Sequence, residues 1–157
     1  FQLDGIGLRP LSYQFDDGTT RSARDVMLKF DWGAGRVTGL AEGSPVDVAV
    51  EPGLQDAASH QAMVQMLLGS GAEPGTIPTI EKDHIKYYRF TLLRRERLAT
   101  TLGVLDTVVF RSSRDGSTRE NIFWYAPELD YLMVQGEQRR DGKRLFQMYI
   151  RNYQPGA

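Results

Sequence analysis

The chain has 157 residues, of which 41% are hydrophobic and 25% charged, close to the averages for globular proteins and enough to build one hydrophobic core. The formal net charge is −1, which argues against a nucleic-acid-binding protein, because such proteins present a basic surface to phosphates. There are 0 cysteines, so disulfide frameworks, thiolate zinc sites, iron–sulfur clusters and cysteine nucleophiles are excluded. No apolar run reaches the roughly 18 residues that a membrane-spanning helix needs.

The first residues indicate that upstream sequence has been removed. The chain starts at Phe1 without a methionine, and the Asp4-Gly5 pair soon follows, as at the end of a strand that enters a turn. We therefore expect a single domain, 1–157, that lacks an N-terminal signal peptide. The removed part could also have held one or more first strands.

Asp-Gly pairs and alternating residues predict antiparallel hairpins. Asp followed by Gly tolerates the positive φ of both central residues in a two-residue turn. Such pairs stand between strand-like runs at Asp17-Gly18, Asp115-Gly116 and Asp141-Gly142. Around the first pair, apolar residues alternate with polar ones over 11–15 and 26–30, a period typical of strands that bury one face.

The pattern changes to helical spacing after residue 54. Asp56 can cap a helix over 56–68, in which Met63 and Met66 belong to an apolar stripe that Gly69 ends. We expect this helix to pack on the sheet. Residues 69–79 contain two prolines and are expected to form a loop.

Strand-like runs resume at Ile80 and continue to the end of the chain. The predicted fold is mainly β, in the α+β class: a strongly curved antiparallel meander sheet, or half-barrel, of about nine to ten strands packed on one main helix.

The sequence offers little for catalysis or metal binding. Any serine–histidine–aspartate arrangement must use His60 or His84, but Ser59 and His60 point about 100° apart on a helix. Two distant histidines without thiols have no spacing typical of a zinc site. Glu128 and Asp130 could serve a glycosidase only if they faced one cleft. We therefore expect no metal, no cofactor and no catalytic residue.

A basic and aromatic stretch precedes residue 98. Arg94, Arg95 and Arg97 follow Tyr87 and Tyr88 closely, and arginines beside aromatic rings on a sheet can stack ligands or bases. The same composition is typical of an exposed strand that resists aggregation. We favour the second interpretation.

One segment resembles a known family. It is Phe123-Trp124-Tyr125-Ala126-Pro127-Glu128-Leu129-Asp130-Tyr131-Leu132-Met133-Val134, which is similar to the signature W-x-A-P-D-L-D-Y-L-P-V of an exported bacterial family, domain of unknown function 3108. Further pieces agree in order: Arg9-Pro10-Leu11-Ser12-Tyr13, Phe30-Asp31-Trp32, Gly35-Arg36-Val37, Pro52-Gly53-Leu54-Gln55-Asp56 and Thr101-Leu102-Gly103. The chain departs from the family pattern at Glu128 and Met133, which weakens any fixed chemical role for these two residues.

The resemblance implies an exported protein of Gram-negative bacteria, periplasmic after signal-peptide removal, and it implies no activity. The signature itself can be explained by architecture. Pro127 ends a strand, Asp130 can tie the turn through its side chain, and Trp124 and Tyr131 can pack across it.

Three functions remain open from the sequence. The leading hypothesis is a non-enzymatic periplasmic protein that binds an apolar or glycan envelope component, a lipid included, in the concave face of its sheet. We expect the ligand to be lined by Trp124, Tyr125, Tyr131, Tyr87 and Arg95. The alternatives are a module that binds another envelope protein through a sheet edge, and a hydrolase acting on envelope glycan or peptide.

Overall fold

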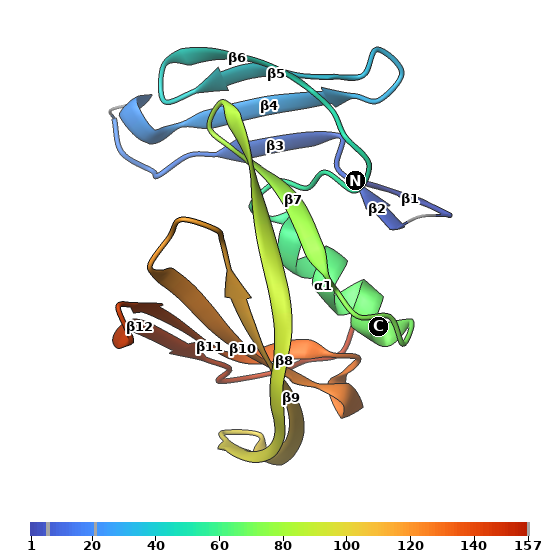
Figure 1. Cartoon of the computed structure of the whole chain (residues 1–157), viewed down its shortest axis with the longest axis vertical. Coiled ribbons are helices and arrows are strands. Elements are labelled where there is room, and N and C mark those ends of the chain that lie inside the picture. The colour runs from blue at the N-terminus through green and yellow to red at the C-terminus, as the bar shows by residue number, and fades with distance from the viewer. Residues whose placement is uncertain (6, 21, 157) are drawn as a thin grey trace. The chain divides into compact units, whose positions relative to one another are not determined.

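The computed structural model describes residues 1–5, 7–20 and 22–156, and strands make up 57% of the chain (Figure 1). The strands are β1 (Gln2–Asp4), β2 (Gly7–Arg9), β3 (Ser12–Phe15), β4 (Val26–Asp31), β5 (Arg36–Ala41), β6 (Ser44–Ala49), β7 (Thr76–Glu81), β8 (His84–Thr100), β9 (Gly103–Ser113), β10 (Arg119–Ala126), β11 (Leu132–Arg140) and β12 (Lys143–Tyr149). One α-helix, α1 (Ser59–Gly69), and the short 3-10 helices η1 (Ser22–Arg24) and η2 (Pro127–Leu129) complete the described elements.

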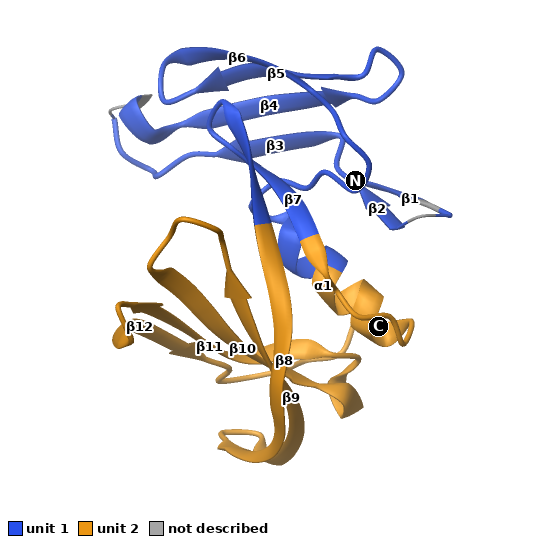
Figure 2. Cartoon of the chain, in the orientation of Figure 1, with its two compact units in different colours: residues 1–63, 77–87 blue, residues 64–76, 88–157 orange. Residues whose placement is uncertain are grey.

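The chain divides into two compact units, coloured separately in Figure 2. Unit 1 comprises residues 1–63 and 77–87, and unit 2 comprises residues 64–76 and 88–157. Helix α1 and strands β7 and β8 each contribute residues to both units. Whether the two units fold as one domain, as we expected, stays a prediction.

Unit 1 is built on a four-stranded antiparallel sheet in the order β3-β4-β5-β6. The predicted alternation along β4 is confirmed: Leu28 and Phe30 are buried, while Met27 and Lys29 are exposed on the opposite face. The buried face forms one core cluster, made of Leu28, Phe30, Val37, Ala41, Val46, Leu54 and Ile80.

Of the three predicted Asp-Gly turns, one is a two-residue hairpin turn and two lie in longer loops. Asp141 and Gly142 both have positive φ, of 51° and 74°, and join β11 to β12 as a two-residue turn, as predicted. Residues 114–118 separate β9 from β10, and residues 16–25, which include η1, separate β3 from β4. Asp16 and Asp17 explain the longer loop, because their carboxylates accept bonds from backbone N–H groups two residues on and so close local turns instead.

The helix cap is the one predicted. The Asp56 carboxylate accepts hydrogen bonds from the N–H groups of Ala58 and Ser59, both at 2.8 Å, and Ser59 Oγ accepts one from the Asp56 N–H at 2.9 Å. The helix proper therefore runs over Ser59–Gly69 and ends at the predicted glycine.

The prediction that residues 69–79 form a loop is wrong for its last part. Strand β7 covers Thr76–Glu81 and contains Pro78. Because β7 is a terminal strand of its sheet, a residue without an N–H group is tolerated there. The Pro78 carbonyl accepts a bond from the Gln55 N–H at 2.9 Å, and the Ile80 N–H donates to the Gln55 carbonyl at 2.8 Å.

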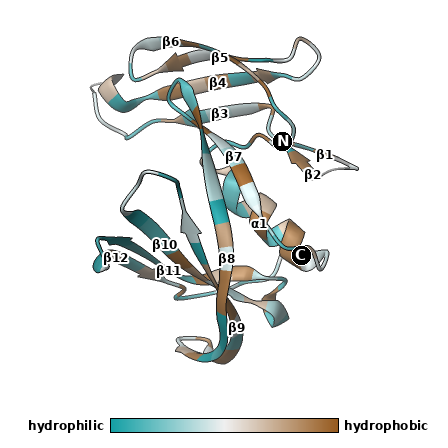
Figure 3. Ribbon diagram, in the orientation of Figure 1, coloured by the Kyte–Doolittle hydropathy of each residue, from teal (hydrophilic) through white to brown (hydrophobic). Residues whose placement is uncertain are grey.

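Unit 2 holds most of a six-stranded antiparallel sheet in the order β12-β11-β10-β9-β8-β7. Hydrophilic and hydrophobic stretches alternate along β8 in Figure 3. Strand β10, in contrast, is buried on both faces from Ile122 to Ala126. Trp124 belongs to a core cluster with Val109 and Val134, while Phe123 and Tyr125 lie against Phe90 and Phe110 on the other face.

The mainly β fold with antiparallel sheets and one helix is confirmed. Instead of one continuous sheet, the described strands form three sheets, of two, six and four strands, and none of them is closed. Pro10 ends β2, since it cannot donate to a ladder, and residues 50–75, which contain the helix, separate β6 from β7.

Candidate functional site

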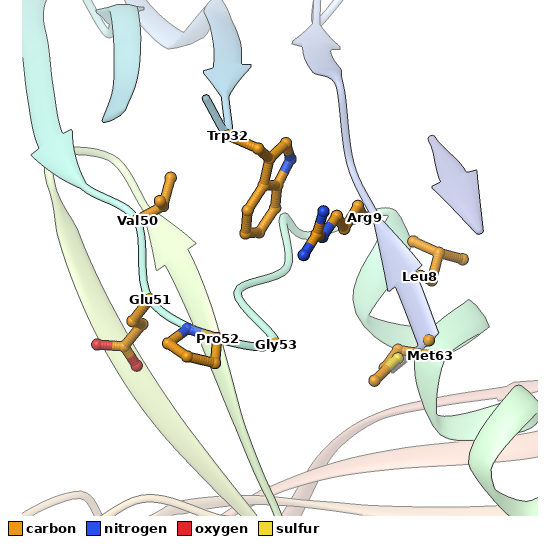
Figure 4. Close-up of a pocket in the computed structure, with 9 residues that line it drawn as sticks. Leu8, Arg9, Trp32, Val50, Glu51, Pro52, Gly53 and Met63 are labelled. Atoms are coloured by element: carbon orange, nitrogen blue, oxygen red, sulfur yellow. The ribbon is translucent and has the colours of Figure 1, made fainter. Parts of the chain in front are cut away.

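The first candidate is a small cavity in unit 1, which we call the Trp32 pocket (Figure 4). It has a volume of about 230 Å³ and is lined by Gly7, Leu8, Arg9, Trp32, Val50, Glu51, Pro52, Gly53 and Met63. Figure 4 shows the indole of Trp32 between Val50 and Arg9, and the Arg9 guanidinium carbon lies 5.2 Å from the indole centroid. The pocket therefore has an apolar wall with one cation beside it.

Local chemistry fixes the walls of this pocket. The indole N–H of Trp32 donates to the Pro10 carbonyl at 2.7 Å, which fixes the orientation of the ring. Residues 51–54 form a turn closed by a 3.2 Å bond from the Leu54 N–H to the Glu51 carbonyl, with Gly53 at a φ of 77°. Proline before glycine favours this turn, and the family resemblance had included both residues.

Gln55 links two of the segments that line the pocket. Its side chain is fully buried, and Nε2 donates to the Leu8 carbonyl at 2.8 Å and to the Gly53 carbonyl at 3.0 Å. A buried side-chain amide that bonds two separate segments holds them at a fixed distance. The pocket is therefore preformed.

Tyr87, expected to line a ligand, lies at the edge of unit 1. Its side chain is 53% exposed and its hydroxyl donates to Glu51 Oε2 at 2.9 Å, which raises the pKa of the Tyr87 hydroxyl. The Glu51 carboxylate points away from the indole of Trp32 (Figure 4). Tyr87 thus contacts a residue of the Trp32 pocket without being one of its lining residues.

A larger hollow covers the exposed face of the four-stranded sheet, and we call it the sheet groove. It has a volume of about 990 Å³ and is lined by residues 11–16, 25–29, 38–40 and 43. Apolar side chains stand open in it: Leu11 and Phe15 are each 44% exposed, Met27 62% and Leu40 54%. Met27 and Leu40 are directly opposite each other on β4 and β5.

Three carboxylates gather near one end of the sheet groove. Oxygens of Asp16, Asp17 and Asp25 lie within 4.8 Å of one another, which is close enough to share a cation. Asp16 and Asp17 already accept bonds from Gly18 and Thr19, and the Thr19 bonds lower the pKa of Asp17. Asp16 and Asp17 are used in turn closure, and one buried oxygen of Asp25 has no hydrogen-bond partner among the described residues. We assign no metal to the three carboxylates.

Unit 2 brings Arg95 and Pro127 together in a charged hollow. Its volume is about 360 Å³, and it is lined by Arg95, Glu96, Arg97, Asp106, Thr107, Val108 and Pro127. The Glu96 carboxylate accepts bonds from Arg94 Nε and from the buried indole N–H of Trp124, and these two donors lower its pKa. Arg94 also lies over the Trp124 ring, 5.9 Å from its centroid.

Two of the expected ligand-lining residues are buried. Trp124 is 4% exposed and Tyr125 0%, and burial raises the pKa of the Tyr125 hydroxyl. Tyr131 lies in the loop after η2, where its N–H donates to the Ala126 carbonyl at 2.9 Å, and the Asp130 carbonyl accepts from the Gln65 side chain. The Asp130 carbonyl thus bonds helix α1, while the turn is closed by the Tyr131 N–H. The expected tie through the Asp130 side chain and a ligand role for Trp124, Tyr125 and Tyr131 stay predictions.

The histidines lie apart and differ in setting. His60 is 7% exposed, with Nδ1 2.6 Å from Thr79 Oγ1, and burial lowers its pKa to about 4. His84 is exposed and hydrogen-bonded to Asp83. The Thr79 hydroxyl beside His60 is itself buried, and Ser59 is engaged in the helix cap. The hydrolase hypothesis stays a prediction.

Sequence reasoning passed over Met27 and Leu40. Both occupy positions where the alternation of a half-buried strand calls for polar residues, and that mismatch was a readable signal. Trp32 and Arg9 were noticed only as parts of the family resemblance, because the contact between β2 and the end of β4 is not local in the sequence.

Comparison with known proteins identifies the family. The family described as "Protein of unknown function (DUF3108)" matches residues 1–144. The chain belongs to the DUF3108 family. No curated protein and no solved structure matches this DUF3108 chain. No helix in the part of the chain that the structure describes has the length and apolar character needed to cross a membrane.

Proposed function

We propose that this DUF3108 protein is a non-enzymatic binding protein of the bacterial envelope that holds a short apolar group of an envelope component in the Trp32 pocket. The pocket carries the proposal, because it combines a fixed indole wall with the apolar side chains of Leu8, Val50 and Met63. At about 230 Å³ it is smaller than the roughly 300–1,000 Å³ of sites for whole drug-sized ligands, which fits one group of a larger molecule.

Arg9 adds selectivity to this proposal. Its guanidinium lies beside the apolar wall, where it can donate to a carboxylate, a phosphate or a sugar oxygen next to the bound group. An apolar group with an acceptor beside it is found in acylated lipids and in substituted glycans. The pocket therefore favours an anionic amphiphile over a cationic one.

Matched small probes test the proposal. Saturation-transfer NMR and titration calorimetry would compare octanoate, octylammonium and tri-N-acetylglucosamine on the wild-type chain. We expect octanoate to bind with a Kd of about 1 mM and octylammonium at least tenfold more weakly, because a single small group provides only about −4 kcal/mol. Binding of the sugar instead would favour the glycan form of the proposal.

Two variants locate the binding. Trp32→Leu removes the aromatic wall and should abolish the saturation-transfer signal of octanoate. Arg9→Gln removes the positive charge and should abolish the preference for octanoate over octylammonium. Trp124→Phe, in unit 2, is the matched aromatic control and should change neither. The proposal fails if neither octanoate nor tri-N-acetylglucosamine binds, or if the one that binds does so equally well to Trp32→Leu.

A periplasmic location and a half-barrel shape belong to the same proposal. The family resemblance supports export, and the antiparallel sheets are compatible with a curved β surface. Fractionation of cells expressing the full gene product would test the location, and small-angle scattering would test the shape.

A second candidate function is a module that binds envelope proteins through a sheet edge. It is favoured by strand β12, one of the two terminal strands of the six-stranded sheet, where Leu145, Phe146 and Tyr149 are 54%, 58% and 58% exposed. A terminal strand with exposed apolar side chains is a template for pairing with another chain.

A further inference from the structure

The sheet groove has a free strand edge along one side. Strand β3 is a terminal strand of its sheet, and in the described ranges it is hydrogen-bonded to β4 alone. Every residue from 11 to 16 lines the groove, so an extended segment lying there would meet the β3 backbone as well as side chains. Free strand edges accept an added strand through main-chain hydrogen bonds, while neighbouring apolar side chains give specificity.

The groove also has a chemical direction. Phe15, Met27 and Leu40 make it apolar, and the carboxylates of Asp16 and Asp25 line it at the end where β3 stops. A complementary segment must therefore be extended, apolar and basic at the end that meets these carboxylates.

Strand β12 of this chain meets each of these requirements. It is a terminal strand, and it is hydrogen-bonded to β11 alone among the described strands. It opens with the exposed cations Lys143 and Arg144, and the exposed apolar residues Leu145, Phe146, Met148 and Tyr149 follow. The contact of Arg144 with Glu137 is long, at 3.4 Å, and the exposed Arg144 side chain can turn to another carboxylate.

We propose that the chain associates with itself head to tail, with β12 of one copy pairing with the free edge of β3 beside the sheet groove of the next, so that its apolar side chains reach into the groove. If Lys143 and Arg144 meet the carboxylates at the end of β3, β12 must run back along the groove toward Leu11. That direction is antiparallel to β3, which is the more stable way to pair two strands. Strand β12 spans roughly 23 Å at about 3.3 Å per residue, enough to cover β3 and the adjoining acidic residues.

This contact joins two different surfaces, so it differs from a two-fold dimer. A heterologous interface leaves one free groove and one free strand on every pair, and it extends into rings or open chains. The proposal goes beyond the Trp32 pocket, whose lining residues take no part in it except through the shared fold of unit 1.

Sedimentation velocity and light scattering of the wild-type chain from 1 to 500 μM provide the first test. We expect concentration-dependent species larger than a dimer, which shrink as salt is raised from 50 to 500 mM. Met27→Glu in the groove and Phe146→Glu on the strand should each leave a monomer. Val104→Glu, at a residue that is 57% exposed on β9, is the control and should associate like wild type.

Mixing the two variants that are expected to stay monomeric gives the decisive measurement. Met27→Glu keeps a working β12 and Phe146→Glu keeps a working groove, so an equimolar mixture should form a 1:1 dimer that cannot grow. Lys143→Asp should weaken association about tenfold, and adding Asp16→Lys in the same chain should restore it. A wild-type chain that stays monomeric, a mixture that forms no dimer, or a Met27→Glu variant that still associates would each overturn the proposal.

Discussion

Gly39 on β5 is the position where the fold should tolerate a side chain least. Its φ is 152°, and a Cβ built there would lie 1.9 Å from the Met27 carbonyl oxygen and 3.1 Å from the Leu28 Cα. Carbon and oxygen normally approach to about 3.3 Å, so alanine would force β5 away from β4 by about 1.4 Å. That displacement would break about two ladder hydrogen bonds, worth about 1 kcal/mol each, and the positive φ adds about 1–2 kcal/mol of strain.

We therefore expect Gly39→Ala to lower the free energy of unfolding by about 3–4 kcal/mol, a large part of the roughly 5–15 kcal/mol of a typical domain. Urea unfolding followed by circular dichroism measures this change. Gly43→Ala is the control, because Gly43 has a φ of 80° but nothing within 4 Å of a new Cβ, so only the strain of about 1–2 kcal/mol applies. Equal losses in the two variants would refute the steric argument.

Three further predictions concern buried polar groups and cooperativity. His60 has a pKa of about 4 in the fold against 6.5 when unfolded, so its contribution to stability is present above pH 6.5 and is lost as the pH falls to 4. Between these pH values, urea unfolding should show a loss of stability about 3 kcal/mol larger for wild type than for His60→Gln, and equal losses would refute the assignment. Glu96→Ala leaves the buried indole N–H of Trp124 without its acceptor and should lower stability by about 1–3 kcal/mol, while Glu96→Gln, which keeps an acceptor, should recover most of it in the same urea assay. If the chain is one cooperative domain, the fluorescence of Trp32 in unit 1 and of Trp124 in unit 2, each measured with the other replaced by phenylalanine, should report the same urea midpoint, and separate midpoints would show two domains.

Local features of the sequence were sufficient to predict most of the secondary-structure elements. The Asp56 cap, the stop at Gly69 and the two-residue turn at Asp141 depend on neighbours in the chain, and the structure has all three as predicted. The start of strand β7 was not predicted, because Pro78 argues against a strand unless the strand is terminal in its sheet. The position of a strand within its sheet is set by pairings between residues distant in the sequence. The strand propensity of local residues therefore could not predict that β7 is terminal.

The candidate sites were less predictable for a related reason. Aromatic richness at 123–125 suggested a ligand-lining face, yet both faces of β10 are buried by neighbours that come from other strands. The Trp32 pocket, in contrast, depends on Gln55, which bonds to Leu8 across 47 residues of sequence. A polar residue that appears unremarkable in the chain thus positions the wall of the cavity.

Of the terminal strands, β3 and β12 differ from well-protected sheet edges. Natural edge strands are usually protected by being short, by inward-pointing charges, by proline or by a covering segment. Strand β12 has seven residues, no proline and apolar side chains open to solvent, and β3 borders an apolar groove. Charges are present, but they lie at the ends of these strands, where they would align a partner rather than repel one along its length. That arrangement is expected of edges selected to pair with a specific strand, and it is why the mixed-variant dimer is a sharper test than aggregation alone.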